Sequence, residues 1–78
     1  MSISAAQVEA DVADILYVEP GELDHEADLR DQGMDSVRIM EVVERWRRAG
    51  VHKVDFIVLA EDQRLVRWLE VVQRLQEQ

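Results

Sequence analysis

The sequence predicts an all-α fold: a four-helix bundle of three long helices and one short helix, with a long loop between the first and second helices. Apolar residues recur at spacings of three and four in three separate segments, which is the period of an amphipathic helix. Glycine and proline interrupt the chain between these segments. The 78 residues are enough for one domain, 1–78, with a single small core.

The first helix is predicted from about Ala5 to Tyr17. Ser4 and Gln7 fit a capping box at its start. The segment 18–21 ends it, because proline cannot continue a helix and glycine favours a turn. The apolar stripe of this helix consists of Val8, Val12, Ile15 and Leu16.

A long connection from about Val18 to Asp35 follows the first helix. Its apolar anchors are isolated, at Leu23, Ala27 and Leu29. A loop of this length without regular structure is uncommon and often functional. Gly33 lies near its end, where we expect a positive φ angle.

The second helix is predicted over 36–49, with Asp35 as its N-cap and Gly50 as its stop. Val37 and Met40 fall off its apolar stripe, so we expect an exposed apolar patch beside the start of the helix. Small exposed patches are often interaction sites, although scattered surface hydrophobic residues are the alternative. The stripe itself consists of Ile39, Val42, Val43 and Trp46.

Two further helices are predicted after a turn at 50–54. The short one spans Asp55 to Ala60 and is capped by its first residue, although the β-branched run 56–59 leaves a strand open. The last helix spans Gln63 to Leu75, with Asp62 as its cap. Its buried stripe consists of Leu65, Trp68, Leu69, Val72 and Leu75.

The charge pattern excludes several classes of partner. There are 9 basic and 17 acidic residues, which gives a net charge of −8. Nucleic acid and anionic membrane both require a basic surface, so we expect neither. Ten acidic residues lie between Glu9 and Asp35, where Arg30 is the one base. A partner with a basic surface is favoured, and a plain solvated face is the alternative.

Cysteine is absent, so neither a disulfide nor a thiolate metal site is predicted. The first residues lack the basic start and long apolar run of a signal peptide, and no stretch approaches transmembrane length. We therefore expect a cytoplasmic protein. We also expect a monomer. His25 and His52 lack metal-ligand spacing, so no metal site is predicted. Trp46 and Trp68 lie in helical stripes and are predicted to be core.

Ser36 is the foremost candidate for hydroxyl chemistry. Threonine is absent, and the other serines, Ser2 and Ser4, lie at the N-terminus. The free N–H groups and the dipole at the start of a helix favour a phosphate at this position. The alternative is that Ser36 only helps to begin the helix. No nucleophile elbow accompanies it, so no catalytic residue is predicted.

Three runs of residues resemble a known family. Asp31-Gln32-Gly33-Met34-Asp35-Ser36-Val37-Arg38 resembles the signature of carrier proteins, a Gly-x-Asp-Ser core that opens helix two. Arg45-Trp46-Arg47 and Asp55-Phe56-x-x-Leu59-Ala60 are similar to aryl carrier proteins of nonribosomal peptide synthesis, especially of catechol or salicylate siderophores. Val37 replaces the common leucine, and Gln63-Arg64 replaces the usual Pro-Thr pair before the last helix.

The resemblance implies a stand-alone, non-catalytic aryl carrier. Ser36 would accept 4′-phosphopantetheine from coenzyme A through a phosphopantetheinyl transferase, with Asp35 beside the metal ion of that enzyme. The thiol of the arm would carry salicylate or 2,3-dihydroxybenzoate as a thioester, from an adenylating enzyme to a downstream condensing enzyme. Phe56 and Ala60 on the next helix would add a second part to the partner surface, beside Val37 and Met40, which the helical period already places in an exposed patch.

Two alternatives stay open at this point. The first is a carrier for another acyl or aminoacyl group. A fatty-acid carrier is disfavoured, because helix two is usually strongly acidic there, whereas this helix contains Arg38, Arg45, Arg47 and Arg48. The second is an unmodified helical docking module.

Overall fold

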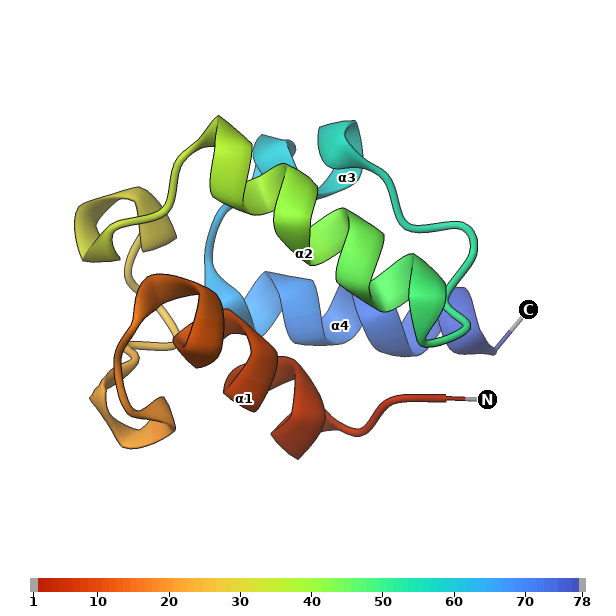
Figure 1. The fold of residues 1–78 in the computed structure, drawn as a ribbon, viewed down its shortest axis with the longest axis horizontal. Helices are drawn as coiled ribbons and strands as arrows, with labels where there is room; N and C mark the ends of the chain where they lie inside the picture. Colours follow the sequence, from red (N-terminus) through yellow and green to blue (C-terminus); the bar gives the residue numbers. More distant parts are fainter. Residues whose placement is uncertain (1, 78) are drawn as a thin grey trace.

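Four α-helices and two short 3-10 turns make up the fold in the computed structural model, which describes residues 2–77 (Figure 1). The predicted all-α bundle is confirmed, and residues 2–77 contain no strand, so the strand alternative for 56–59 is wrong. None of the helices in this range has the length and apolar character that crossing a membrane requires. The elements are α1 (Ala5–Leu16), η1 (Pro20–Glu22), η2 (Leu29–Gln32), α2 (Ser36–Arg48), α3 (Phe56–Glu61) and α4 (Leu65–Gln76).

Two tryptophans form the centre of the core, as predicted. Trp46 of α2 and Trp68 of α4 are fully buried and meet edge to face, with ring centroids 6.1 Å apart and planes at 87°. Such a pair contributes about 0.5–1.5 kcal/mol beyond its buried area. The indole N–H of Trp46 donates to Asp11 Oδ2 at 2.9 Å, and that of Trp68 donates to the carbonyls of Leu59 and Asp62. Both buried donors are therefore satisfied.

The apolar stripes predicted for α1 and α2 are buried along their whole length. In α4 the agreement is close: Leu69 and Leu75 are half-buried and pack against the core, whereas Val71, outside the predicted stripe, is buried. α3 contributes one fully buried residue, Leu59. The helical period alone therefore identified the faces around which the bundle closes.

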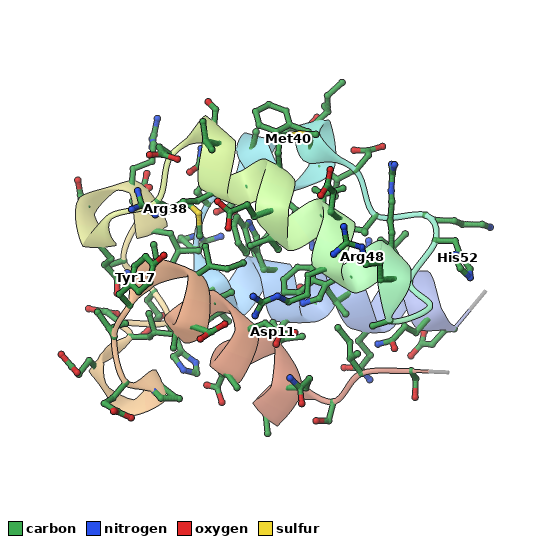
Figure 2. All side chains as sticks on the ribbon, viewed as in Figure 1. Asp11, Tyr17, Arg38, Met40, Arg48 and His52 are labelled. Atoms are coloured by element: carbon green, nitrogen blue, oxygen red, sulfur yellow. The ribbon has the colours of Figure 1, made fainter. Side chains whose placement is uncertain are left out.

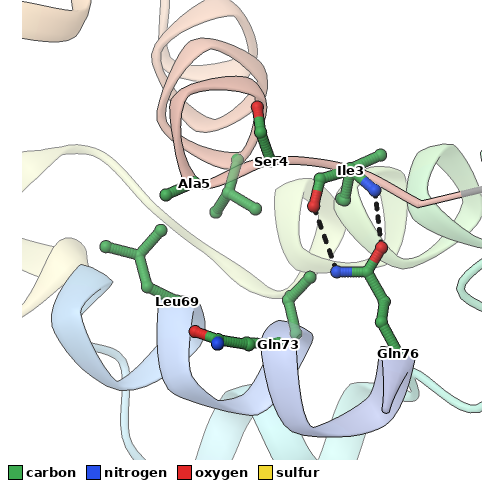
Figure 3. Close-up of a pocket in the computed structure, with 8 residues that line it drawn as sticks. Ile3, Ser4, Ala5, Leu69, Gln73 and Gln76 are labelled. Carbon is green, nitrogen blue, oxygen red and sulfur yellow. Dashed lines mark hydrogen bonds between the residues drawn. The ribbon is translucent and has the colours of Figure 1, made fainter.

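α1 begins at its predicted cap but without a complete capping box. Ser4 Oγ accepts a hydrogen bond from the backbone N–H of Gln7 at 3.1 Å. The side chain of Gln7 does not return to the cap, because it donates to Asp11 Oδ1 at 2.8 Å. The residues before α1 lie against α4, where the amide of Gln76 pairs with the backbone N–H and carbonyl of Ile3 (Figure 3). A hollow of about 210 Å³ lies there between the two helices.

Three helical segments end in the same motif. A residue with a positive φ follows each segment directly or after one further residue: 61° at Tyr17, 109° at Gly33 and 107° at Gly50, which comes after Ala49. This is the Schellman motif, which usually places glycine at the left-handed position. The positive φ expected for Gly33 is confirmed. α1 ends one residue earlier than predicted, because Tyr17 leaves the helix. In each motif an N–H donates to the carbonyl five residues back, in the pairs Val18 to Ala13, Met34 to Leu29 and Val51 to Trp46.

The long connection is more ordered than predicted, because η1 and η2 lie within it. Leu23 and Leu29 are buried anchors, as expected. The side chain of Gln32 braces the loop by accepting from the N–H of Asp24 and donating to the carbonyls of Asp24 and Ala27. These bonds join the middle of the loop to its η2 segment and fix the path of the chain ahead of α2.

The start of α4 differs from the prediction. The helix begins two residues later, and Asp62 does not cap it. The N–H of Val66, which has no acceptor inside the helix, donates instead to the carbonyl of His25 at 2.9 Å. The carbonyl of Gln63 accepts from the N–H of Leu29 at 2.7 Å. The long connection therefore caps α4 from a distance in the chain, which a local pattern cannot reveal. Asp55, by contrast, caps α3 as predicted.

Candidate functional site

Ser36 is the first residue of α2 and is exposed. Asp35 is the N-cap, as predicted, and its Oδ1 accepts from the backbone N–H of Arg38 at 2.9 Å. The N–H groups of Ser36 and Val37 have no partner within residues 2–77, as helix geometry requires at this position. The site thus joins an exposed hydroxyl to two open backbone donors at the positive end of a helix dipole.

A clamp formed by Arg38 holds the segment that leads into α2. Its Nη1 donates to Asp35 Oδ2 at 3.0 Å and to the carbonyl of Gly33 at 3.3 Å. Between them, Met34 is buried in the core. The serine is therefore presented on a braced turn. Sequence reasoning assigned Arg38 no role here, although its position three residues after an N-cap carboxylate was a usable signal.

The hydroxyl of Ser36 has no activating group around it. Its Oγ makes no hydrogen bond to any other residue of the described part of the chain. His25 contacts Glu9, and His52 lies at the end of the molecule away from Arg38 (Figure 2). Within residues 2–77, no group of three or more histidine or acidic side chains could hold a metal ion. A serine nucleophile requires an adjacent base, and the described residues place none beside Ser36.

Three of the four large exposed apolar residues within 2–77 lie on α2 and α3, which are neighbours in the fold (Figure 1), and the fourth is Tyr17 at the end of α1. Val37 is 70% exposed and Met40 is 46% exposed, so their predicted exposure is confirmed. Ile57 of α3 is 67% exposed and was missed, because a six-residue helix is too short for its period to identify a face. Phe56 and Ala60 are both half-buried, and the ring of Phe56 packs against the core.

The run Arg45–Arg47 is engaged inside the fold. The first arginine pairs with Asp14 of α1 at 2.9 Å, and this hydrogen bond raises the pKa of the arginine. The indole between them donates to Asp11, and the second arginine donates through Nε to the carbonyl of Val54 at 2.8 Å. These residues therefore connect α2 to α1 and to the turn that follows α2.

Comparison with known proteins identifies the family. Residues 6–72 match the family described as a phosphopantetheine attachment site. The acyl carrier protein ScoB of Streptomyces coeruleorubidus is 41% identical over 63 residues, which cover 81% of this chain and 73% of ScoB. The chain belongs to this phosphopantetheine-binding family, whose members are non-catalytic carriers with a covalently attached 4′-phosphopantetheine group.

Two other relatives are far longer than this chain. The isochorismatase of Bacillus subtilis is 41% identical over 61 residues, which cover 78% of this chain and 19% of that protein. The phenyloxazoline synthase MbtB of Mycobacterium tuberculosis is 42% identical over 65 residues, which cover 83% of this chain and 4% of the synthase. No solved structure matches the chain significantly.

Proposed function

We propose that Ser36 is the attachment point of the 4′-phosphopantetheine group and that this single domain presents a thioester-bound cargo on it. The observation that carries this proposal is the exposed Ser36 hydroxyl at the start of α2, beside two N–H groups without partners in residues 2–77. A phosphodiester there gains about 0.3–1 kcal/mol from the helix dipole. The bound group supplies a thiol, which the chain lacks because it contains no cysteine.

Asp35 has a second proposed role during attachment. Its side chain is 55% exposed, so a phosphopantetheinyl transferase can reach it. Oδ1 holds the helix cap and Oδ2 pairs with Arg38. Oδ2 takes no part in the cap, so it is the oxygen that would turn toward the metal ion of the transferase, and Arg38 competes with that ion for it.

Intact mass tests the attachment. After incubation with coenzyme A, magnesium and a broadly specific transferase, the wild type should gain one phosphopantetheine, and Ser36→Ala should gain none. The variant should stay folded, because an exposed hydroxyl is lost without opening a cavity. Ser2→Ala, another exposed serine, is the matched control and should be modified like the wild type. A mass gain in Ser36→Ala would overturn the assignment, and an unmodified wild type would favour the docking-module alternative.

We infer further that the cargo is an aryl acid, salicylate or 2,3-dihydroxybenzoate, passed from an adenylating enzyme to a condensing enzyme by a stand-alone, cytoplasmic, monomeric carrier. Two similarities support this. The runs at 45–47 and 55–60 resemble aryl carriers, and one relative is named for a product with a phenyl ring. The similarity to ScoB, an acyl carrier protein covered over 73% of its length, favours the alternative of another acyl cargo.

A loading assay separates the two cargo classes. Enzymes that activate salicylate or dihydroxybenzoate should acylate the modified protein, and enzymes that activate amino acids or other acids should not. Loading by the second group alone would move the protein to the peptidyl or acyl class.

The proposed partner surface is formed by Val37, Met40, Phe56 and Ala60. Its support is strongest on α2, where the first two are exposed beside Ser36. On α3, Phe56 packs against the core, so Ile57 is the more accessible apolar contact and is added to the surface. Interface energy concentrates in a few such residues, which cost more than about 1 kcal/mol each when truncated.

A further inference from the structure

A hollow of about 290 Å³ opens beside Ser36, between the end of α1 and the start of α2. It extends from Ser36 toward α1, whereas the proposed partner surface extends along α2 to α3, and the two share Val37. Two of its lining residues are the direct neighbours of Ser36 in the chain. The lining consists of Ile15, Tyr17, Asp35, Val37, Arg38 and Glu41.

Neither the backbone conformation nor packing in the core favours a tyrosine at position 17 of this wall. Its φ of 61° is a left-handed conformation, which strains a residue with an L side chain but causes no steric strain in glycine. The equivalent positions of the other two Schellman motifs are Gly33 and Gly50. The side chain of Tyr17 is not part of the core, since the residue is 87% exposed. An unfavourable backbone conformation without a packing reward is the kind of outlier that indicates a functional role.

The polar groups of the hollow are available to a ligand. Arg38 uses Nη1 within the protein, and its Nε and Nη2 make no hydrogen bond to residues 2–77. The carboxylate of Glu41 and the hydroxyl of Tyr17 likewise have no partner in that range. The hollow therefore combines a cationic donor, an anionic acceptor and an apolar wall. Tyr17 and Arg38 lie at the same end of the molecule (Figure 2).

We propose that this hollow binds the pantoate portion of the chain's own phosphopantetheine arm, an inference that rests on the proposed function. The pantoate unit is bonded directly to the phosphate, so an arm on Ser36 holds it beside the hollow at high effective concentration. Its two geminal methyl groups pack against the ring of Tyr17 and the side chain of Val37. Its hydroxyl and amide groups form hydrogen bonds with the donor groups of Arg38 and the carboxylate of Glu41. The thiol end stays outside and carries the cargo.

Nuclear magnetic resonance of the modified protein tests this directly. The geminal methyl protons of the arm should show nuclear Overhauser effects to the ring of Tyr17, and an upfield shift relative to free coenzyme A. Tyr17→Phe should retain the shift, and Tyr17→Gly should remove it. Glycine suits the φ at this position, so Tyr17→Gly should stay folded with a melting temperature equal to or above that of the wild type.

Ile57→Ala is the matched control, because it removes another exposed apolar side chain, on α3, that does not line the hollow. It should leave the methyl shift unchanged. Methyl shifts identical to those of free coenzyme A, or a shift removed by Ile57→Ala and kept in Tyr17→Gly, would overturn the inference. Intact mass is measured first: an unmodified Ser36 refutes the proposed function, whereas a modified protein with a free arm refutes this inference alone.

Discussion

The two faces of α2 have different surroundings within one 13-residue helix. The inner face, formed by Ile39, Val42, Val43 and Trp46, is at most 2% exposed. The outer face begins with Ser36 and continues through Val37 and Met40, which are 70% and 46% exposed. Stability therefore depends on one face and presentation of the serine on the other, so substitutions should affect the two separately.

The largest expected contrast is between two neighbours in the sequence. Ile39→Ala should destabilise the fold by about 2–5 kcal/mol, because it opens a cavity in the core. Met40→Ala should change the free energy of unfolding by no more than about 0.5 kcal/mol. Thermal or urea unfolding measures both. Equal destabilisation by the two substitutions would show that the faces of α2 are assigned wrongly.

Met40→Ala also tests the outer face as a partner surface. It should slow transfer of the cargo to a downstream condensing enzyme while leaving stability unchanged, because an interface contact is lost without a cavity. Acyl-transfer rates for the modified variant measure this. A stable variant that transfers its cargo normally to its cognate enzymes would show that Met40 is not a contact with the partner.

A smaller effect is expected at Asp11 of α1, which accepts the hydrogen bond of Trp46 from the inner face of α2. Asp11→Ala should cost about 1–3 kcal/mol, because it leaves the buried indole N–H of Trp46 without an acceptor. Asp11→Asn keeps an oxygen at that place and should cost less. Urea unfolding of both variants checks this, with modification of Ser36 expected to be unaffected. A fully stable Asp11→Ala would mean that the indole finds another acceptor.

The smallest effect is expected outside α2, in the response to acid. Hydrogen bonds from Arg30 and Arg64 hold the pKa of Asp28 and of Asp62 below the ordinary value of 3.8. The folded pKa is the lower one, so the contribution of each pair is complete above that ordinary value and is lost as the pH falls through the folded value. Both arginines are exposed and both carboxylates are only partly buried, so the loss should be small.

Melting temperature measured against pH checks the acid response. Below about pH 4, the wild type should lose stability more steeply than Asp28→Asn/Asp62→Asn. Glu61→Gln, which removes an exposed carboxylate without an ion pair in residues 2–77, is the control. Parallel curves for the wild type and the double variant would show that the pairs contribute nothing.

The sequence by itself determined the number and order of the helices, the inner face of α2 and the place of Ser36, but not where α4 begins. Stripes, caps and stops depend on residues within about five positions of one another, so Asp35, Asp55 and Gly33 could be interpreted without the fold. The Gly-x-Asp-Ser signature likewise lies within one short run that ends at Ser36. The family match then agreed with that local pattern.

Only the tertiary structure decided the features that join distant parts of the chain. The cap of α4 comes from His25, and the partner of Trp46 is Asp11, 35 positions away. The hollow beside Ser36 exists because Tyr17, at the end of α1, is placed next to the start of α2. Such contacts depend on how the long connection folds back, and no local pattern of residues encodes that path.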